Sequence, residues 1–275
     1  MSLAAKLPYT HAYAGGYPSL GSQRLPTDSD CLTYLAAVAA ADGAGVEVGV
    51  AMAVDEFFRD TKASGVFSAL KASCILAGAR TLAGALVPVV GDAPTNVANG
   101  FVEGDYSRTA GLTGDGATTY LDSGRAGNAD PQNDQHMSVY HSAIGDPGGG
   151  SLGSGAGVGG ATNLAAGATG QYGSRHRSAN FYGSGVTPSA GFFGASRESS
   201  SAYVMRYDGV NDAVSIASQT PYPNTYFVFA RNDSSPGLEA FSNSTIAYYS
   251  IGTSLSLEAL DTAVTNLLTA IGEAL

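Results

Sequence analysis

The first folded part of the chain carries apolar residues at helical spacing. Residues 27–30 read Thr-Asp-Ser-Asp, which can cap a helix, and Leu32, Leu35, Ala36 and Ala39 then follow up to Gly43. Residues 47–64 are amphipathic, with Val50, Val54, Phe57, Phe58 and Thr61 on one face and Asp55, Glu56, Arg59 and Lys62 largely opposite. The pattern predicts two helices, the second ended by Gly65, and allows one further helical turn within residues 66–73.

Residues 108–124 change the period from helical to alternating, and the rest of the chain follows this change. Gly114, Asp115 and Gly116 suit a tight reversal, because glycine tolerates positive φ. In residues 118–122, Thr119 and Leu121 face one way and the intervening side chains the other. The stretch predicts a strand of a β-sandwich at 118–122.

Further strands are predicted wherever alternation or β-branched and aromatic residues recur. They are residues 74–79, 135–143, 181–182, 192–193, 203–218 with a turn near Asp208 and Gly209, 224–231 and 244–252. Residues 79–108, interrupted by Pro88, Gly91 and Pro94, predict loops that link strands.

The chain ends in a predicted amphipathic helix. Ser256 can cap this helix, and Glu258 and Asp261 suit its positive end. One apolar stripe follows, made of Leu257, Leu260, Val264, Leu267, Leu268 and Ile271. Because this stripe would otherwise face water, we expect the helix to pack on the sandwich.

Two stretches are rich in glycine and proline. Residues 145–173 hold twelve glycines and predict either a flexible loop or a closely packed pair of hairpins, with the hairpins preferred. Residues 1–26 place Tyr9, Tyr13 and Tyr17 among prolines and glycines. This segment is either a disordered tail or an extended arm whose tyrosines contact a neighbouring subunit or a particle.

Composition narrows the classes of function. The 275 residues are 13% charged and 44% hydrophobic, with a formal net charge of −10 and no lysine after Lys71. A folded protein is expected, and nucleic acid is excluded as a partner because no basic stripe is available to neutralise phosphates. No stretch resembles a signal peptide or has the length of apolar sequence that spans a membrane, so synthesis in a reducing cytoplasm is predicted.

Few residues suggest chemistry at a site. Cys31 and Cys74 have no metal-binding spacing and predict two buried or half-buried free thiols, and no cofactor or metal is predicted. His136 and His141 lie five apart on one predicted strand and should point to opposite faces. The predicted strands lack the carboxyl pair of a glycosidase, which makes an enzyme unexpected.

Arg175, His176 and Arg177 form the one dense basic spot of the chain. The simplest interpretation is an exposed turn, and the alternative is a contact with an anion or a glycan.

Three motifs together resemble a known class of protein. They are DEFFRDTKASGVFSALKASCILAGA, GLTGDGATTYLDSG and AYYSIGTSLSLEALDTAVTNLLTAIGEAL. Their order is similar to that of tailed-bacteriophage virion proteins that carry a concanavalin-A-like, or laminin-G-like, jelly roll. The resemblance covers about residues 55–275 and implies a mainly β fold. We predict an extended arm (1–26), a helical attachment region (27–73), the sandwich (74–253) and a C-terminal helix (254–275).

The resemblance also implies a function. It predicts a virion structural protein, made in the bacterial cytoplasm, that decorates a capsid or belongs to a tail or fibre and assembles with other virion proteins and with itself, as a trimer. The alternative is a lectin-like module for host-surface glycans, although the chain has no Trp and only its 15 Tyr could stack on a sugar. A polysaccharide hydrolase is the third and least favoured prediction.

Overall fold

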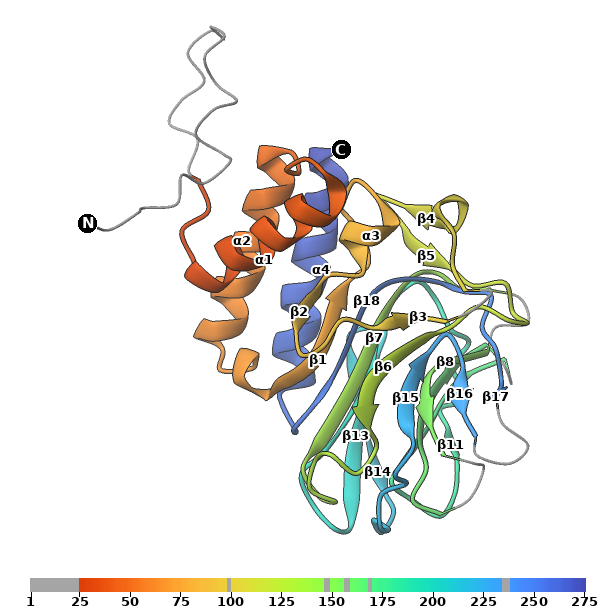
Figure 1. Ribbon diagram of the computed structural model, residues 1–275. Coiled ribbons are helices and arrows are strands. Elements are labelled where there is room, and N and C mark those ends of the chain that lie inside the picture. The colour runs from red at the N-terminus through yellow and green to blue at the C-terminus, as the bar shows by residue number, and fades with distance from the viewer. Residues whose placement is uncertain (1–24, 98–99, 146–148, 156–158, 168–169, 234–237) are drawn as a thin grey trace, which may run out of the picture.

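The computed structural model describes residues 25–97, 100–145, 149–155, 159–167, 170–233 and 238–275. Two β-sheets face each other in a sandwich, and a layer of helices covers the outer face of one of them (Figure 1). The predicted class, a mainly β concanavalin-A-like sandwich with helices before it and a helix after it, is confirmed. Residues 1–24, which make up nearly all of the predicted arm, lie outside the described residues.

The first sheet contains both the first and the last strand of the sandwich. Its order is β14 (Val210–Ser215), β13 (Ala202–Tyr207), β12 (Gly191–Arg197), β7 (Gln135–Ala143), β18 (Thr245–Gly252), β1 (Leu70–Ile75) and β2 (Pro88–Val90), with β5 (Gly111–Thr113) beside β18 and β4 (Tyr106–Ser107) beside β5. All its pairs are antiparallel, and the first strand β1 runs beside the last strand β18.

The second sheet contains the glycine-rich stretch. Its order is β11 (Tyr182–Gly183), β10 (Tyr172–His176), β9 (Thr162–Ala166), β8 (Gly149–Ser154), β15 (Thr225–Val228), β6 (Leu121–Ala126) and β3 (Thr95–Asn96), with β16 (Arg231–Asn232) parallel to β8 and β17 (Leu238–Glu239) beside β16. The strands β8, β9 and β10 form the predicted pair of hairpins. A Cβ on Gly149 would lie 2.1 Å from the Phe241 carbonyl oxygen, so glycine allows this close backbone approach.

Two helices open the described structure, as predicted. α1 (Ser29–Asp42) begins after Asp28, whose side chain caps it, and ends at Gly43 with φ of 73°. α2 (Val48–Ala63) follows, and Gly65 adopts φ of 78° just after it. The further turn is a short 3-10 helix, η2 (Phe67–Ala69). Between β1 and β6 lie two more short helices, α3 (Leu82–Ala85) and η3 (Glu103–Asp105).

The C-terminal helix α4 (Leu257–Ala274) packs beside α2 on the outer face of the first sheet (Figure 1). Leu260, Val264 and Ile271 are fully buried, and the Ser256 hydroxyl caps the helix by accepting from the Ala259 N–H. Leu268 is only partly buried at the edge of this core. The prediction that the helix is part of the folded unit is therefore confirmed.

A second core fills the space between the sheets. Met137 and Val139 of β7 meet Leu152 and Leu164 of the opposite sheet, all with no exposed surface. The helical layer and the sandwich interior thus share the first sheet, whose two faces are both covered. This explains why β18 is buried at every position.

Three predicted strands differ from the structure. The strand expected at residues 118–122 begins only at Leu121, because the Asp115 carboxylate accepts the backbone N–H groups of Ala117, Thr118 and Thr119 and holds them in a turn. The strand expected at 74–79 starts earlier, at Leu70, and ends at Ile75, so residues 76–79 lie outside it. The strand expected at 224–231 is interrupted by Phe229, whose φ is 69°.

The loop region predicted at 79–108 also contains more structure than expected. It includes β2, which forms the edge of the first sheet. Pro88 opens this strand, and proline is tolerated at a sheet edge because its missing N–H is not needed there.

Candidate functional site

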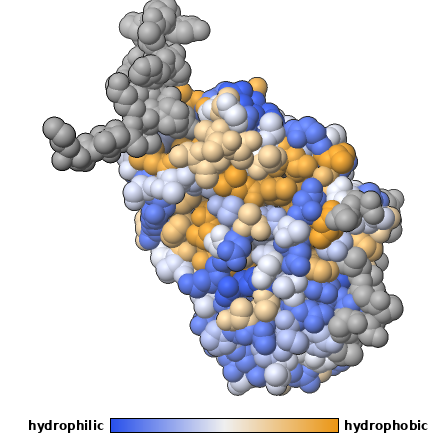
Figure 2. Space-filling view, in the orientation of Figure 1, coloured by the Kyte–Doolittle hydropathy of each residue, from blue (hydrophilic) through white to orange (hydrophobic). Residues whose placement is uncertain are grey.

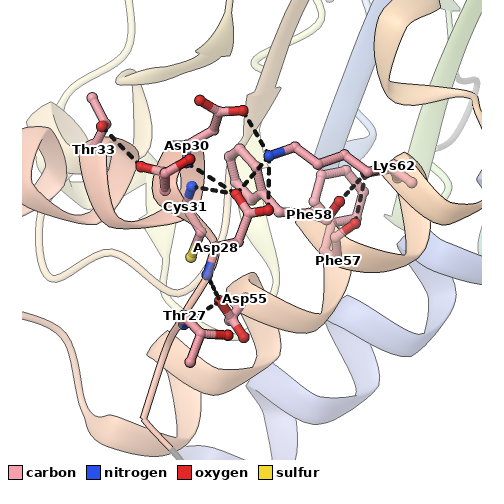
Figure 3. Close-up of polar contacts among 11 residues, drawn as sticks. Thr27, Asp28, Asp30, Cys31, Thr33, Asp55, Phe57, Phe58 and Lys62 are labelled. Atoms are coloured by element: carbon pink, nitrogen blue, oxygen red, sulfur yellow. Dashed lines mark hydrogen bonds and ion pairs between the residues drawn. The ribbon is translucent and has the colours of Figure 1, made fainter.

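The root of the N-terminal arm is tied to α2 by a buried carboxylate. The backbone N–H groups of Thr27 and Asp28 both donate to Oδ1 of Asp55 at 2.8 Å, and Asp55 has no exposed surface (Figure 3). Because Thr27 and Asp28 come directly before α1, these bonds fix the position of the chain at the start of this helix. The chain enters the described structure at a defined place.

Asp28 joins the arm root to both helices. Its carboxylate accepts the N–H groups of Asp30 and Cys31, at 3.0 and 3.1 Å, and lies 2.7 Å from Nζ of Lys62 in the last turn of α2 (Figure 3). Burial opposes ionisation of Asp28, yet the hydrogen bonds from Lys62 and from the two backbone groups hold its pKa below the ordinary value.

Lys62 carries the positive charge of this cluster. Its Nζ also lies 2.6 Å from Asp30 and stands 5.8 and 5.2 Å from the ring centres of Phe58 and Phe67. Burial favours the neutral amine, but the two carboxylates outweigh this effect and raise the pKa of Lys62. The arm root is therefore held by the ion pairs of Lys62 with Asp28 and Asp30, and the Lys62 ammonium group lies over the rings of Phe58 and Phe67.

An apolar groove starts beside this anchor and runs between α1 and the sheet edge. Its volume is about 390 Å³. The lining residues are Asp30, Thr33, Tyr34 and Ala37 of α1, Phe67 of η2, and Val87, Pro88, Val89 and Val90 at strand β2. We call it the α1–β2 groove. In the described part of the chain β2 pairs with β1 alone, which leaves the other edge of β2 without a partner strand.

The outer face of α1 is unusually short of charge. Its exposed positions after the first turn are Thr33, Ala37, Ala40 and Ala41, and Ala44 follows the helix. Hydrophobic residues gather over the helical half of the face seen in Figure 2, whereas hydrophilic residues predominate toward the far end of the sandwich. The groove therefore belongs to the apolar end of a two-ended molecule.

Of the predicted contact residues, only the basic ones lie in the described part of the chain. Tyr9, Tyr13 and Tyr17 lie outside the described residues. Arg175, His176 and Arg177 do not form an exposed turn: Arg175 and His176 end β10, and the side chains of His176 and Arg177 have no exposed surface. That interpretation is wrong, and an external glycan or anion could meet only Arg175, which is partly exposed.

Buried arginines instead hold the loops at one end of the sandwich together. Arg177 donates to the carbonyl oxygens of Pro131 and Gly127, and Arg197 donates to those of His176, Ser199, Ala202 and Ile216. Five N–H donors on one guanidinium can serve several carbonyl groups at once. The basic spot noted in the sequence is structural.

The two histidines of β7 point to opposite faces, as predicted. His136 bonds to the Thr253 carbonyl oxygen and to Ser250, whereas Nε2 of His141 meets Oγ of Ser151 in the other sheet at 2.9 Å. Burial lowers the pKa of both imidazoles to about 4. Neither histidine is placed to exchange protons with a substrate.

The two cysteines, like the histidines, are buried. Cys31 and Cys74 are buried free thiols, as predicted, and burial raises the pKa of each to about 12. Among the described residues, no cluster of three or more His, Cys, Asp or Glu side chains is arranged to hold a metal ion. No described helix is long and apolar enough to cross a membrane.

Sequence reasoning missed the main residue of the anchor. Asp55 was placed on the polar face of α2, but it is fully buried. The signal was present in its spacing, since Ala51, Val54, Asp55 and Phe58 follow the i, i+3, i+4, i+7 rule of a buried stripe. A carboxylate on such a stripe needs a buried donor, and the arm root supplies two.

Comparison with known proteins gives little. No protein-family model matches the sequence, and no curated protein matches it. Among solved structures, the NanB sialidase of Streptococcus pneumoniae (K499G mutant) is similar over 48% of this chain and 24% of its own, at 13% identity and a TM-score of 0.36. The Trypanosoma rangeli sialidase is similar over 82% of this chain and 40% of its own, at 10% identity and a TM-score of 0.41.

The leech intramolecular trans-sialidase is similar over 51% of this chain and 23% of its own, at 11% identity and a TM-score of 0.35. This chain therefore spans less than half the length of each of these proteins. At such identities and TM-scores the likeness assigns no function to this chain.

Proposed function

We propose that this protein is a structural component of a tailed-bacteriophage virion, either a capsid decoration or a part of the tail or fibre. The observation that carries the proposal is the two-ended character of the molecule. The arm root and the C-terminal helix belong to the helical layer and the apolar α1–β2 groove borders it, while the sandwich extends away from this layer (Figures 1 and 2). Such a molecule can be held at one end and displayed at the other.

The anchor at Asp55 supports this assignment. An arm that serves attachment must transmit force to the fold, and two backbone bonds to a buried carboxylate join it to α2. The Lys62 pair with Asp28 adds a second link. The partners in this proposal are other virion proteins and further copies of this chain, and neither nucleic acid nor insertion into a membrane is involved.

Binding without catalysis is part of the same proposal. The imidazoles of His136, His141 and His176 are buried, and their pKa values lie below the ordinary range because burial disfavours the charged form. The glycan-binding alternative has one surface feature in its favour, a depression of about 420 Å³ beside the start of α4. Its tyrosine, Tyr203, is only 2% exposed and cannot stack on a sugar ring, so the structural role is preferred.

The direct test is binding to particles assembled without this protein. Purified chain should co-sediment with such virions, and Ala37→Glu, which puts a charge on the exposed groove face of α1, should reduce binding at least tenfold. Val210→Glu is the matched control, because Val210 is 58% exposed on the sandwich. Equal binding by the two variants, or no binding by the unchanged protein, would refute attachment through the helical layer.

A further inference from the structure

We propose that the α1–β2 groove receives the N-terminal arm of a second copy of this chain. The proposal rests on the proposed virion role, because it names the partner of the helical layer. Residues 1–24 are the segment concerned, and their last residue adjoins Leu25, where the described structure begins.

The arm root is directed away from its own groove. Thr27 and Asp28 are bonded to α2, whereas the far wall of the groove is β2. In Figure 1 the segment before α1 reaches that helix from the side away from β2. Leu25 is 56% exposed, and Pro26 after it favours extended backbone at Leu25. A neighbour's groove suits this direction of the arm root better than the chain's own.

The groove matches an extended tyrosine-bearing peptide. Its lining includes the apolar or aromatic side chains of Tyr34, Phe67 and Val89, and the strand that lines it, β2, is an edge strand of the first sheet. Pro88 has no N–H, so the three-residue strand β2 offers few backbone donors at its open edge, and the fit rests on side chains of an extended segment that enter the groove. The arm offers Tyr9, Tyr13 and Tyr17 on a backbone whose prolines and glycines disfavour helix.

Charge favours exchange between copies. Residues 1–24 contain Lys6 and Arg24 and no acid, which leaves 11 basic and 23 acidic residues, a net charge of −12, in residues 25–275. Two such bodies repel each other, and the arm is the part of opposite sign. Asp30, whose side chain is 58% exposed, stands at the start of the groove. An arm crossing to a neighbour therefore lowers the repulsion between the bodies.

The contact joins two different surfaces, the arm of one copy and the groove of the next. Contacts of this head-to-tail kind generate closed rings when the rotation between copies is a simple fraction of a turn. A closed ring of any size, three copies included, satisfies every arm and every groove. The predicted trimer is one assembly that this single repeated contact can build.

Two single-cysteine variants of the full chain test the proposal. Tyr13→Cys places a thiol on the arm, and Ala37→Cys places one on the exposed groove face of α1. A tag on one variant separates the chains by mass, so a mixed disulfide after mild oxidation reports an arm in another copy's groove. Cys31 and Cys74 are buried, and the unchanged protein measures their background. Val210→Cys replaces Ala37→Cys in the control pair.

We expect the mixed disulfide to form at least fivefold more from the groove pair than from the control pair. The double variant Tyr13→Cys/Ala37→Cys would instead give a link within one chain if each arm covered its own groove, and that result overturns the proposal. Equal yields from the two pairs, or no link at all, also overturn it.

Particle binding, measured on the same proteins, separates this proposal from the proposed function. Loss of particle binding with the mixed disulfide intact counts against the virion role and supports arm exchange. Particle binding without the mixed disulfide supports the virion role and counts against arm exchange.

Discussion

The carboxylate of Asp28 lies 2.7 Å from the ammonium group of Lys62, which follows it by 34 residues along the chain. This pair joins the N-cap of α1 to the last turn of α2. The pair also lies where the arm enters the fold. The side chain of Asp28 makes both the local capping interaction of α1 and the tertiary contact with Lys62. The geometry makes the arm root sensitive to a change at either residue.

Lys62→Met should lower the free energy of unfolding by about 1–2 kcal/mol, because it removes hydrogen bonds to two carboxylates while a long apolar chain still covers Phe58 and Phe67. Urea unfolding measures the change. Arg59→Met is the matched control, since its contact with Glu56 is exposed on both sides and should contribute less than about 0.5 kcal/mol. Equal losses of unfolding free energy in the two variants would mean that the Lys62 pair contributes no more than an exposed ion pair.

Stability should fall steeply as the pH drops from about 6.5 toward 4. The pKa values of His136 and His141 are about 4 in the fold against an ordinary value near 6.5, so in this window the unfolded chain binds protons that the folded chain does not. Each histidine then costs about 3 kcal/mol by pH 4.

Thermal melts between pH 7 and pH 4 measure this loss. The His141→Gln variant, which keeps a polar group near Ser151, should lose less stability over the same range. The depressed pKa of Asp28 acts in the same direction at lower pH, since its contribution is lost as the carboxylate is protonated. Identical pH profiles for the variant and the unchanged protein would contradict the assignment.

The parts of this fold that the sequence predicts are those in which one period dominates. The β7 strand alternates cleanly, so its bounds and the opposite directions of His136 and His141 could be predicted. The strand at Leu121 could be placed only approximately, because the Asp115 turn competes locally with extended backbone. The edge strand β2 carries no period of its own and exists because β1 is beside it.

The candidate site could not be predicted from the sequence, because its residues depend on contacts with distant parts of the chain. Asp55 and Lys62 are ordinary residues of an amphipathic helix until the chain before α1 folds against them. Arg177 looks like a surface cation, and only the tertiary structure supplies the carbonyl groups of Gly127 and Pro131 that make its burial tolerable. Long-range partners of this kind leave no periodic trace in a single sequence.

The C-terminal helix should be indispensable. Leu260→Asp with Leu267→Asp buries two unpaired carboxylates, since these positions are 0% and 2% exposed in the core beneath the helices. Burial of each leucine is worth roughly 1.5–3 kcal/mol, against a usual total stability of about 5–15 kcal/mol. We expect insoluble protein or a state without a cooperative melt. Thr262→Asp with Thr269→Asp, on the exposed face of the same helix, should keep a cooperative melt and lose only about 1 kcal/mol through repulsion from Glu258 and Glu273.

The purified protein should not hydrolyse polysaccharides. A glycosidase needs two carboxyl groups flanking one bond, and the glutamates predicted to lie in helices do not supply such a pair on the strands. Incubation with host-envelope polysaccharide, followed by a reducing-end assay, checks this expectation. Release of reducing ends that disappears when a single Asp or Glu is replaced would contradict it and would favour the hydrolase prediction.

The full chain should be an oligomer, a trimer by its resemblance to phage fibres and decorations, and removal of residues 1–26 should dissociate it. The physical reason is that the body carries the repulsive charge of −12, whereas residues 1–24 carry the opposite sign and the three tyrosines. Multi-angle light scattering on the full chain and on a shortened chain beginning at Thr27 measures both masses. Rising salt provides a second reading, since screening weakens the attraction of the arm and the repulsion between bodies together. A monodisperse monomer for both chains, at every salt concentration, would contradict assembly through the arm.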